Sequence, residues 1–421
     1  MNRHERRQAK KLRIAGGAPP RLGGSDDLKS FALSHLQSGR WVDAEALYEK
    51  ALTIEPSDPD VLHFLGIIAY RTGRYDLATT RLTEATGVAP GYAEAHNNLG
   101  ILLLEQQKFD QAIARFGRAV SLKPNYAAAY ANLGNALRKS GSPKNAIASY
   151  RRAIQLNPRH KEAHYWLAAA LLSQGDLAGV IDVCDDCLEL DPLCQHALAY
   201  QAVAQYGLNK EADAKSLVDF ATMVVKAQIR APSPFDDIDT FNDALSADIR
   251  AHPSLIWEPP DRVTRGGSVT KDLLDSPTAT VISLEQALRV AIDEFRNSLP
   301  ADSSHPFFGT TPEAYRLTLI ASILKAGGHH PSHIHEGAWL SGVYYVNVPK
   351  VISEGDEGHA GWLEFGRPDC EIPAGCELKI SAVAPEPGAV VIFPSYFFHH
   401  TIPYQDAGER IGVAFDAYRV R

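Results

Sequence analysis

The sequence contains little cysteine and no long apolar run, and each absence excludes a class of protein. No apolar stretch reaches the roughly 20 residues that a membrane-spanning helix needs, so we expect no membrane partner. An odd number of thinly scattered cysteines does not suit a disulfide framework, and it favours a reducing, cytoplasmic environment. These cysteines are Cys184, Cys187, Cys194, Cys370 and Cys376.

Positive charge is concentrated at the start of the chain. Residues 1–23 carry seven Lys and Arg side chains against Glu5, a net charge of +6, whereas the whole chain carries −8, which leaves −14 for the rest. This segment lacks the apolar core of a secretory signal, and we expect residues 1–24 to be a basic, disordered tail. The acidic remainder argues against nucleic acid as the main partner.

A 34-residue repeat is the strongest pattern in the chain. Small residues in each unit let two helices approach closely, and a proline ends each pair. One such pair cannot bury its own apolar face, so the units must stack into a solenoid. The period and residue types resemble the tetratricopeptide repeat over Ser25–Asp191, in five units. The prolines that mark the period are Pro56, Pro90, Pro124, Pro158 and Pro192.

The pattern weakens after Pro192. Residues 196–206 and 212–225 are expected to form a sixth, irregular helix pair that caps the array, which places the repeat domain at residues 25–230. The segment 231–240 contains two prolines and a charge cluster, and we interpret it as a linker. The second domain is then expected to span residues 241–421.

Two features of the repeats bear on binding. Cys184 and Cys187 form a C-x-x-C, but they occupy helix positions of the repeat, so we interpret them as core residues. Asn98 and Asn132 are one repeat apart, and Asn135 follows one turn later. They resemble the asparagine ladder with which some tetratricopeptide arrays bind an extended peptide, although asparagine is also a common residue at these positions.

The second half of the sequence changes from helices to strands. We expect helices at 241–249 and 283–299, and a turn at Gly266–Gly267. Alternating apolar residues begin at Tyr315, and short strands between Gly, Pro and Asp turns predict a β-sandwich or barrel with helices packed outside. The further expected strands are 338–348, 361–366, 377–384, 389–394 and 410–420.

Candidate metal ligands concentrate in this half. His333 and His335 are two residues apart, so on a strand both would point to one face and could grip one metal. A third candidate is His399, or its neighbour His400, in the run PSYFFHHTIP. Arg410 opens a later strand, where it shares a face with two small residues, Gly412 and Ala414, which predicts an anionic ligand beside the guanidinium.

The run HIH, then LSGVYYVNVP, GWLEF, PGAVVIFPS and an arginine strand resembles the 2-oxoglutarate/iron(II) oxygenases related to prolyl hydroxylases. That resemblance implies a double-stranded β-helix, a jelly-roll or cupin-like fold, whose facial triad reads H-x-D/E … H. His333 and His399 match the histidine ligands, and His335 stands where the acid is usual. Arg410 and Tyr345 match the residues that hold the 2-oxoglutarate carboxylate.

The resemblance implies Fe(II) as metal, with 2-oxoglutarate and dioxygen as cosubstrates of a hydroxylation. We expect the repeats to recruit a protein or peptide. Two alternatives stay open. One is a cupin-type metal enzyme that does not use 2-oxoglutarate, because Gly327 precedes the H-x-H at cupin spacing. The other is a catalytically inactive repeat scaffold, which the histidine in place of the acid favours.

Overall fold

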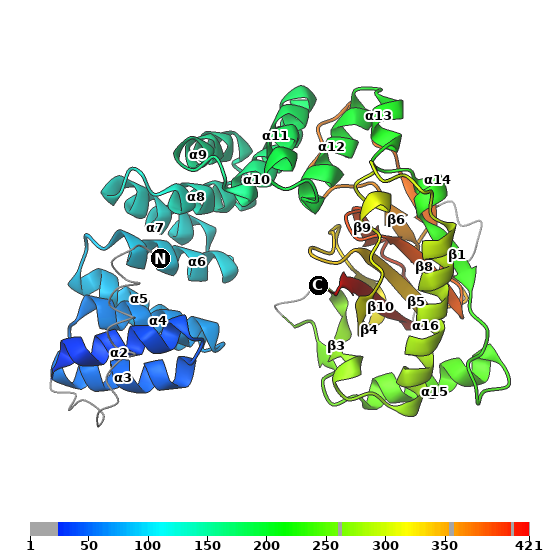
Figure 1. The fold of residues 1–421 in the computed structure, drawn as a ribbon, viewed down its shortest axis with the longest axis horizontal. Helices are drawn as coiled ribbons and strands as arrows, with labels where there is room; N and C mark the ends of the chain where they lie inside the picture. Colours follow the sequence, from blue (N-terminus) through cyan, green and yellow to red (C-terminus); the bar gives the residue numbers. More distant parts are fainter. Residues whose placement is uncertain (1–23, 260–262, 353–357, 406–407, 421) are drawn as a thin grey trace. The chain divides into compact units, whose positions relative to one another are not determined.

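The computed structural model describes residues 24–259, 263–352, 358–405 and 408–420 (Figure 1). The expected basic tail therefore lies outside the described residues. The chain divides into two compact units, Met1–Ser142 and Pro143–Arg421. No helix of the described residues is long and apolar enough to cross a membrane.

Seven helices form the described part of the first unit, and we call them the N-terminal repeats. The first helices of successive pairs begin at residues 25, 59, 93 and 127, and the second helices at 41, 75 and 109, so each series keeps the 34-residue step. The helices are α2 (Ser25–Gln37), α3 (Trp41–Ile54), α4 (Pro59–Arg71), α5 (Tyr75–Val88), α6 (Ala93–Glu105), α7 (Phe109–Leu122) and α8 (Ala127–Lys139).

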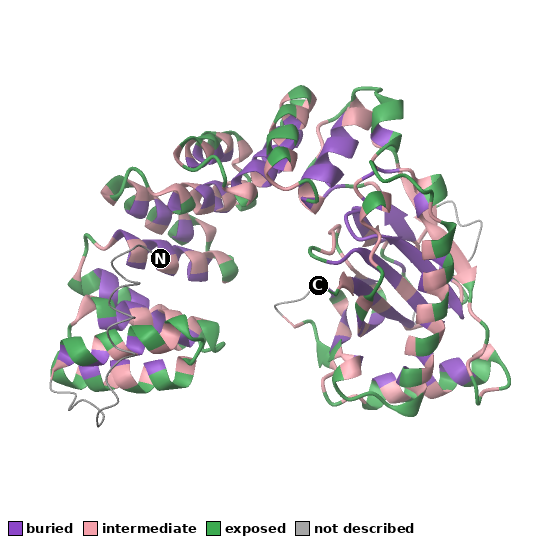
Figure 2. Ribbon diagram, in the orientation of Figure 1, coloured by how far each residue is buried: buried purple, intermediate pink, exposed green. Residues whose placement is uncertain are grey.

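Small residues set the spacing within these pairs. A Cβ on Gly100 would lie 2.7 Å from the ring of Phe116, and one on Gly66 would lie 2.6 Å from Leu82. Both large side chains are buried, so each glycine is the gap into which the next helix packs. Figure 2 shows the result as helices with one buried face and one exposed face.

The repeat continues without interruption into the second unit, and we call these helices the C-terminal repeats. Their first helices begin at residues 161 and 195, and their second helices at 143, 177 and 211, still in the 34-residue register. The segment expected to form one helix over 212–225 instead holds two short ones. The elements are α9 (Pro143–Leu156), α10 (Lys161–Leu172), α11 (Leu177–Leu190), α12 (Gln195–Gly207), α13 (Glu211–Lys215) and α14 (Phe220–Met223).

Two antiparallel sheets, with two longer helices, follow the repeats in the second unit. One has the strand order β1-β8-β5-β10-β4-β3-β2 and the other β7-β6-β9, and together they form the expected double-stranded β-helix. The strands are β1 (Val225–Gln228), β2 (Ile256–Trp257), β3 (Arg265–Asp272), β4 (Tyr315–His329), β5 (Leu340–Asn347), β6 (Leu363–Phe365), β7 (Ser381–Val383), β8 (Ala389–Pro394), β9 (His399–Thr401) and β10 (Arg410–Arg419).

Helices α15 (Ile238–Ala251) and α16 (Ala279–Ser298) pack on strands β5 and β8 of the larger sheet. Tyr344 on β5 donates a hydrogen bond of 2.6 Å to the side-chain carbonyl of Asn242 on α15. The apolar core beneath these helices also includes Leu198 and Ala202 of α12, so the last repeat and the sheets share one core.

Two expectations for this half need correction. Gly266–Gly267 is not a turn but part of β3, where a Cβ on Gly266 would lie 2.8 Å from the Cα of Gly328 on β4. The glycines are there because two backbones approach closely. In addition, β1 pairs with β8 ahead of residues 231–240, so the sheet begins before the segment interpreted as a linker.

Candidate metal centre

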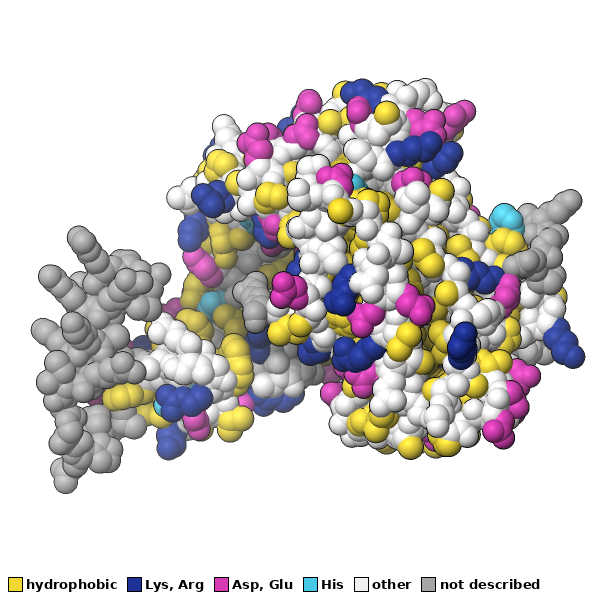
Figure 3. Space-filling view, turned by 45° about the vertical axis from the view of Figure 1, so that its right-hand side comes forward, with side chains coloured by type: hydrophobic (Ala, Val, Ile, Leu, Met, Phe, Trp, Pro, Cys, Tyr) yellow, Lys and Arg dark blue, Asp and Glu magenta, His cyan; other side chains and the backbone are white. Residues whose placement is uncertain are grey.

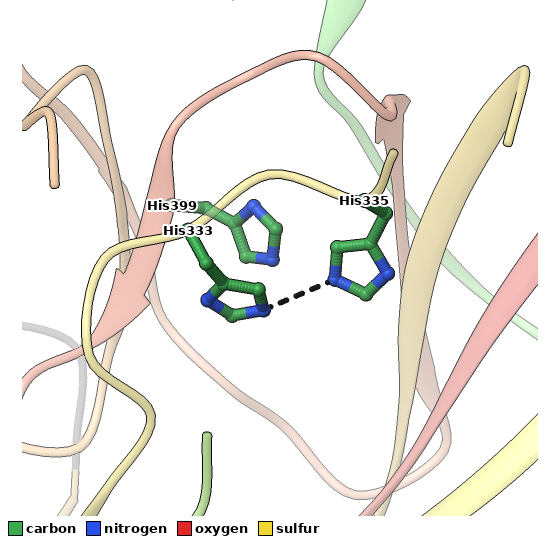
Figure 4. Close-up of side chains that lie close together, drawn as sticks. All are labelled: His333, His335 and His399. Atoms are coloured by element: carbon green, nitrogen blue, oxygen red, sulfur yellow. Dashed lines mark hydrogen bonds between the residues drawn. The ribbon is translucent and has the colours of Figure 1, made fainter. Parts of the chain in front are cut away.

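Three histidines from two separate segments of the second unit converge. His333 and His335 lie on the segment between β4 and β5, and His399 begins β9. The candidate ligand nitrogens lie within 4.8 Å of one another, and the three rings face a common point (Figure 4). The two-residue spacing predicted that His333 and His335 would lie on a regular strand. The segment is instead irregular, with a single bridge from His333 to His399.

Each histidine turns its Nδ1 toward an oxygen atom outside the cluster. His333 Nδ1 lies 2.8 Å from the carbonyl of Pro331, and His399 Nδ1 lies 2.9 Å from the carbonyl of Phe397. His335 Nδ1 lies 2.7 Å from Asp416 Oδ1. An oxygen acceptor favours the proton on Nδ1, which in a neutral ring leaves the Nε2 lone pair free for a metal.

The Nε2 atoms of His333 and His335 are 3.1 Å apart (Figure 4). Two lone pairs at this distance repel each other unless a proton or a metal ion lies between them. Burial, followed by the charge of His335, lowers the pKa of His333 to about 4, and burial also places the pKa of His399 well below its ordinary value. Both rings are therefore neutral at physiological pH, the state that binds metal.

Backbone hydrogen bonds fix the segment that carries His335. The amide of His335 donates to the carbonyl of Ser395 at 2.9 Å, and that of Trp339 donates to Ala417 at 2.8 Å. Between them, the amide of Gly337 donates to Oε1 of Gln195 at 2.6 Å, and Nε2 of Gln195 donates to the carbonyl of Ala338 at 2.6 Å. Gln195 is the first residue of α12, so a repeat helix holds the segment beside the histidines.

A cavity of about 310 Å³ opens onto the histidines. Both sheets line it, with Ile320 and Val343 from the larger sheet and Leu363 from the smaller one. Alternate residues of β10 also face it, as expected for Arg410, Gly412 and Ala414, and the series continues to Asp416 and Tyr418. This volume lies at the lower end of the range of small-molecule binding sites, about 300–1,000 Å³.

Arg410 is the cationic group of this cavity. It is 4% exposed, and no carboxylate among the described residues forms an ion pair with it. Its Nε and the hydroxyl of Tyr345 are both buried without a hydrogen-bond partner in the part of the chain that the structure describes. The guanidinium carbon lies 5.0 Å from the centre of the Tyr345 ring. Nη1 of Arg410 donates to the hydroxyl of Thr401 at 3.5 Å. An anionic ligand in the cavity would compensate the charge of Arg410, since a buried charge without a counter-charge is costly. Arg410 lines the cavity, whereas Tyr345 is not among its lining residues.

Comparisons with known proteins agree with this geometry. A family model described as "Putative 2OG-Fe(II) oxygenase" matches residues 320–416, and tetratricopeptide-repeat models match residues 35–99, 97–158 and 131–193. The chain carries tetratricopeptide repeats and a 2OG-Fe(II) oxygenase domain. A search of curated proteins gave no match.

Solved structures resemble part of the chain. PilF of Pseudomonas aeruginosa is 22% identical, with 46% of this chain and 88% of that one covered and a TM-score of 0.42. MamA of Desulfovibrio magneticus is 22% identical, with coverage of 41% and 97% and a TM-score of 0.38. YrrB, whose structure is titled as a tetratricopeptide-repeat protein with an unusual peptide-binding site, is 19% identical, with coverage of 40% and 88% and a TM-score of 0.37.

Three other residues near the histidine cluster of the oxygenase domain do not belong to it. His400 also lines the cavity, but its Nε2 lies 3.6 Å from Oε1 of Glu364, and it is His399 that joins the other two histidines. Glu336 is exposed at the rim of the cavity. His330 lines the cavity and contacts the hydroxyl of Thr401 at 3.3 Å.

The asparagines of the N-terminal repeats contact one another across helices. Asn132 donates to Oδ1 of Asn97 at 3.0 Å, and Nδ2 of Asn98 lies 2.7 Å from Nε2 of His63. Oδ1 of Asn135 accepts a bond from Arg138 at 3.4 Å. Asn98, Asn132 and Asn135 are all half-buried. The bonds of Asn98 and Asn132 join neighbouring helices, whereas that of Asn135 lies within α8.

Two residues of the site escaped the sequence analysis. Asp416 could have been found by extending the face of Arg410, Gly412 and Ala414 by one more step. Its carboxylate accepts a hydrogen bond of 2.6 Å from Ser341 in addition to its contact with His335. Burial raises the pKa of Asp416, but His335 and Ser341 outweigh burial and lower it overall. Gln195 gave no signal, because its partners lie more than 140 residues away.

Proposed function

We propose that the chain is an Fe(II)- and 2-oxoglutarate-dependent dioxygenase, a hydroxylase, with His333, His335 and His399 as iron ligands. One observation carries the proposal: three converging imidazoles line the same cavity as a buried guanidinium that has no carboxylate partner among the described residues. Imidazole nitrogens suit iron, and three ligands leave positions open for the cosubstrates. When bound, iron and 2-oxoglutarate would use dioxygen to hydroxylate a C–H bond, with release of succinate and carbon dioxide.

The residues of the chain would orient the reactants. Arg410 would hold the distal carboxylate of 2-oxoglutarate by paired hydrogen bonds, and the hydroxyl of Tyr345 would donate a further one. Among the described residues, the Nε of Arg410 and the hydroxyl of Tyr345 have no hydrogen-bond partner. The apolar walls at Ile320, Val343 and Leu363 would keep water away from the reacting atoms.

The N-terminal repeats would recruit a protein or peptide substrate. Asn98, Asn132 and Asn135 offer amide groups that can both donate to and accept from a peptide backbone. Acidic and basic side chains are interspersed on the face of the molecule in Figure 3, which suits a polypeptide partner better than a polyanion.

Anaerobic reconstitution with Fe(II), followed by a succinate assay, tests the proposal. His333→Ala and His399→Ala should each abolish iron binding, and Glu336→Ala is the matched control that should retain it. Arg410→Lys should keep iron but raise the apparent KM for 2-oxoglutarate strongly, because lysine keeps the charge and loses the two-pronged fork. Equal iron content in the wild type and His333→Ala would contradict the ligand assignment.

The same assay separates the alternatives. A cupin-type enzyme would bind metal and turn over without 2-oxoglutarate. An inactive scaffold would produce no succinate with any candidate peptide, even when iron is bound. Succinate formation that requires both iron and Arg410 would exclude both.

A further inference from the structure

The three Nδ1 acceptors of the metal centre differ in charge. Those of His333 and His399 are neutral backbone carbonyls, but that of His335 is the carboxylate of Asp416, at 2.7 Å. His335 is also the residue that stands where the related oxygenases have an acidic ligand. The ligand position at which a histidine replaces the usual acid is therefore the one whose Nδ1 contacts a carboxylate.

Asp416 is held in this place by the strand pairing. It lies opposite Ser341 in the register of β10 and β5, and the Ser341 hydroxyl donates to the same oxygen that contacts His335. Asp416 is 8% exposed, and Ser341 is fully buried. A carboxylate that accepts from two donors at 2.6 and 2.7 Å is oriented toward the ring and shielded from solvent.

The contact between Asp416 and His335 affects the net charge of the metal centre. Three neutral imidazoles would leave the full double charge of a divalent metal in a buried cavity beside the Arg410 cation. The two carboxylates of 2-oxoglutarate neutralise only part of that charge, so one positive charge remains. Asp416 supplies the missing negative charge, and a buried site is stable only when its charges are compensated.

We propose that Asp416 is a positioning residue for the metal. It fixes His335 with Nε2 facing the metal, and it supplies the negative charge of the absent acidic ligand through His335 rather than by direct contact with the metal. The inference rests on the proposed function for the identity of the metal. Carboxylates that back a metal-binding histidine commonly change metal affinity by 10–100-fold.

A double-mutant cycle on the full-length protein tests this assignment. Co(II) and Fe(II) are titrated without oxygen into the wild type, Asp416→Asn, His335→Asp and the double variant, and the Kd and the Co(II) absorption spectrum are measured. Asparagine keeps a hydrogen-bond acceptor but loses the charge, so Asp416→Asn should weaken binding about 10–100-fold in the wild type. In His335→Asp, which restores the acidic ligand, the same change should have no effect or should tighten binding, because two carboxylates would otherwise adjoin.

Glu364→Gln is the matched control. Glu364 is equally buried and contacts His400, but none of the three candidate ligands, so this variant should bind Co(II) as the wild type does. If Asp416→Asn binds as tightly as the wild type while His333→Ala does not bind, the role of Asp416 is refuted and the metal centre stands. If the wild type itself binds neither metal, the proposed function fails first. An equal loss in both backgrounds would reduce Asp416 to a structural residue.

Discussion

The N-terminal and C-terminal repeats follow the same 34-residue period but are used differently. The N-terminal repeats bury their apolar faces among themselves, in clusters such as that around Phe116 and Leu99. In the C-terminal repeats, α12 contributes Leu198 to the core of the oxygenase domain, and Tyr200 donates to Asp369 of that domain. The residues that repeat every 34 positions thus determine how the helices pack on one another. The residues that do not repeat determine what else each helix contacts.

The largest expected effect is the difference in folding between two shortened chains, one that lacks the C-terminal repeats and one that keeps them. A chain that begins at residue 231 lacks α12 and β1, so its sheet loses an edge strand and part of its core, and it should not fold. A chain that begins at Pro143 keeps both and should fold and bind Fe(II). Circular dichroism during heating and iron content measure the two outcomes. Cooperative unfolding of the shorter chain would mean that the C-terminal repeats are dispensable.

Phe116→Ala should affect only the N-terminal repeats. The ring is fully buried in the gap left by Gly100, and its removal should lower the free energy of unfolding by about 3–5 kcal/mol. We expect an earlier melting transition of the first unit and an unchanged Kd for Fe(II). A parallel loss of iron affinity would show that the two sets of repeats are one energetic unit.

Gln195→Ala should affect the metal centre from a repeat helix. The side chain makes hydrogen bonds to Gly337, Ala338 and Ser395, each worth about 0.5–1.5 kcal/mol, so the free energy of unfolding should fall by about 2–4 kcal/mol. Faster hydrogen exchange at the Gly337 amide and weaker Fe(II) binding are the readouts. Gln106→Ala is the control, because the side-chain bonds of that glutamine among the described residues, with Thr79 and Lys108, lie within the N-terminal repeats.

The smallest effect on stability is expected from Asn98→Ala combined with Asn132→Ala. Each loses a partner on a neighbouring helix, at a cost of about 0.5–1.5 kcal/mol. If these amides hold a peptide, calorimetric titration with a peptide that the enzyme hydroxylates should show weaker binding, and the melting temperature should fall by only a few degrees. Unchanged affinity would leave the asparagines a purely structural role.

The sequence predicted the repeats well because each contact there is local. Helix starts at 25, 59, 93, 127, 161 and 195 follow directly from the period. Within the oxygenase domain, the family resemblance and the two-residue spacing indicated that His333, His335 and His399 would meet. Whether they bind iron stays a prediction, as do the roles of Arg410 and Tyr345.

The sequence could not predict contacts that depend on distant pairing. The glycines of β3 looked like a turn, because the approach of β4 is visible only once both strands are placed. Gln195 stands where earlier repeats have Ala127 and Lys161, so nothing in the period distinguishes it. Its partners follow 142 and 143 residues later, a separation over which side-chain chemistry gives no signal.

The hydrogen bonds of Gln195 also have a consequence for the order of folding during synthesis. Helix α12 leaves the ribosome long before Gly337 and Ser395 have been synthesised, so these bonds can form only later. Arg410 and Asp416 arrive still later, on β10, the last strand, which pairs with β4 and β5 along the middle of the sheet. Loop closure over such distances is slow. The solenoid can therefore be complete while the metal centre is not, and a nascent chain gains its proposed chemistry only after β10 has paired with β4 and β5.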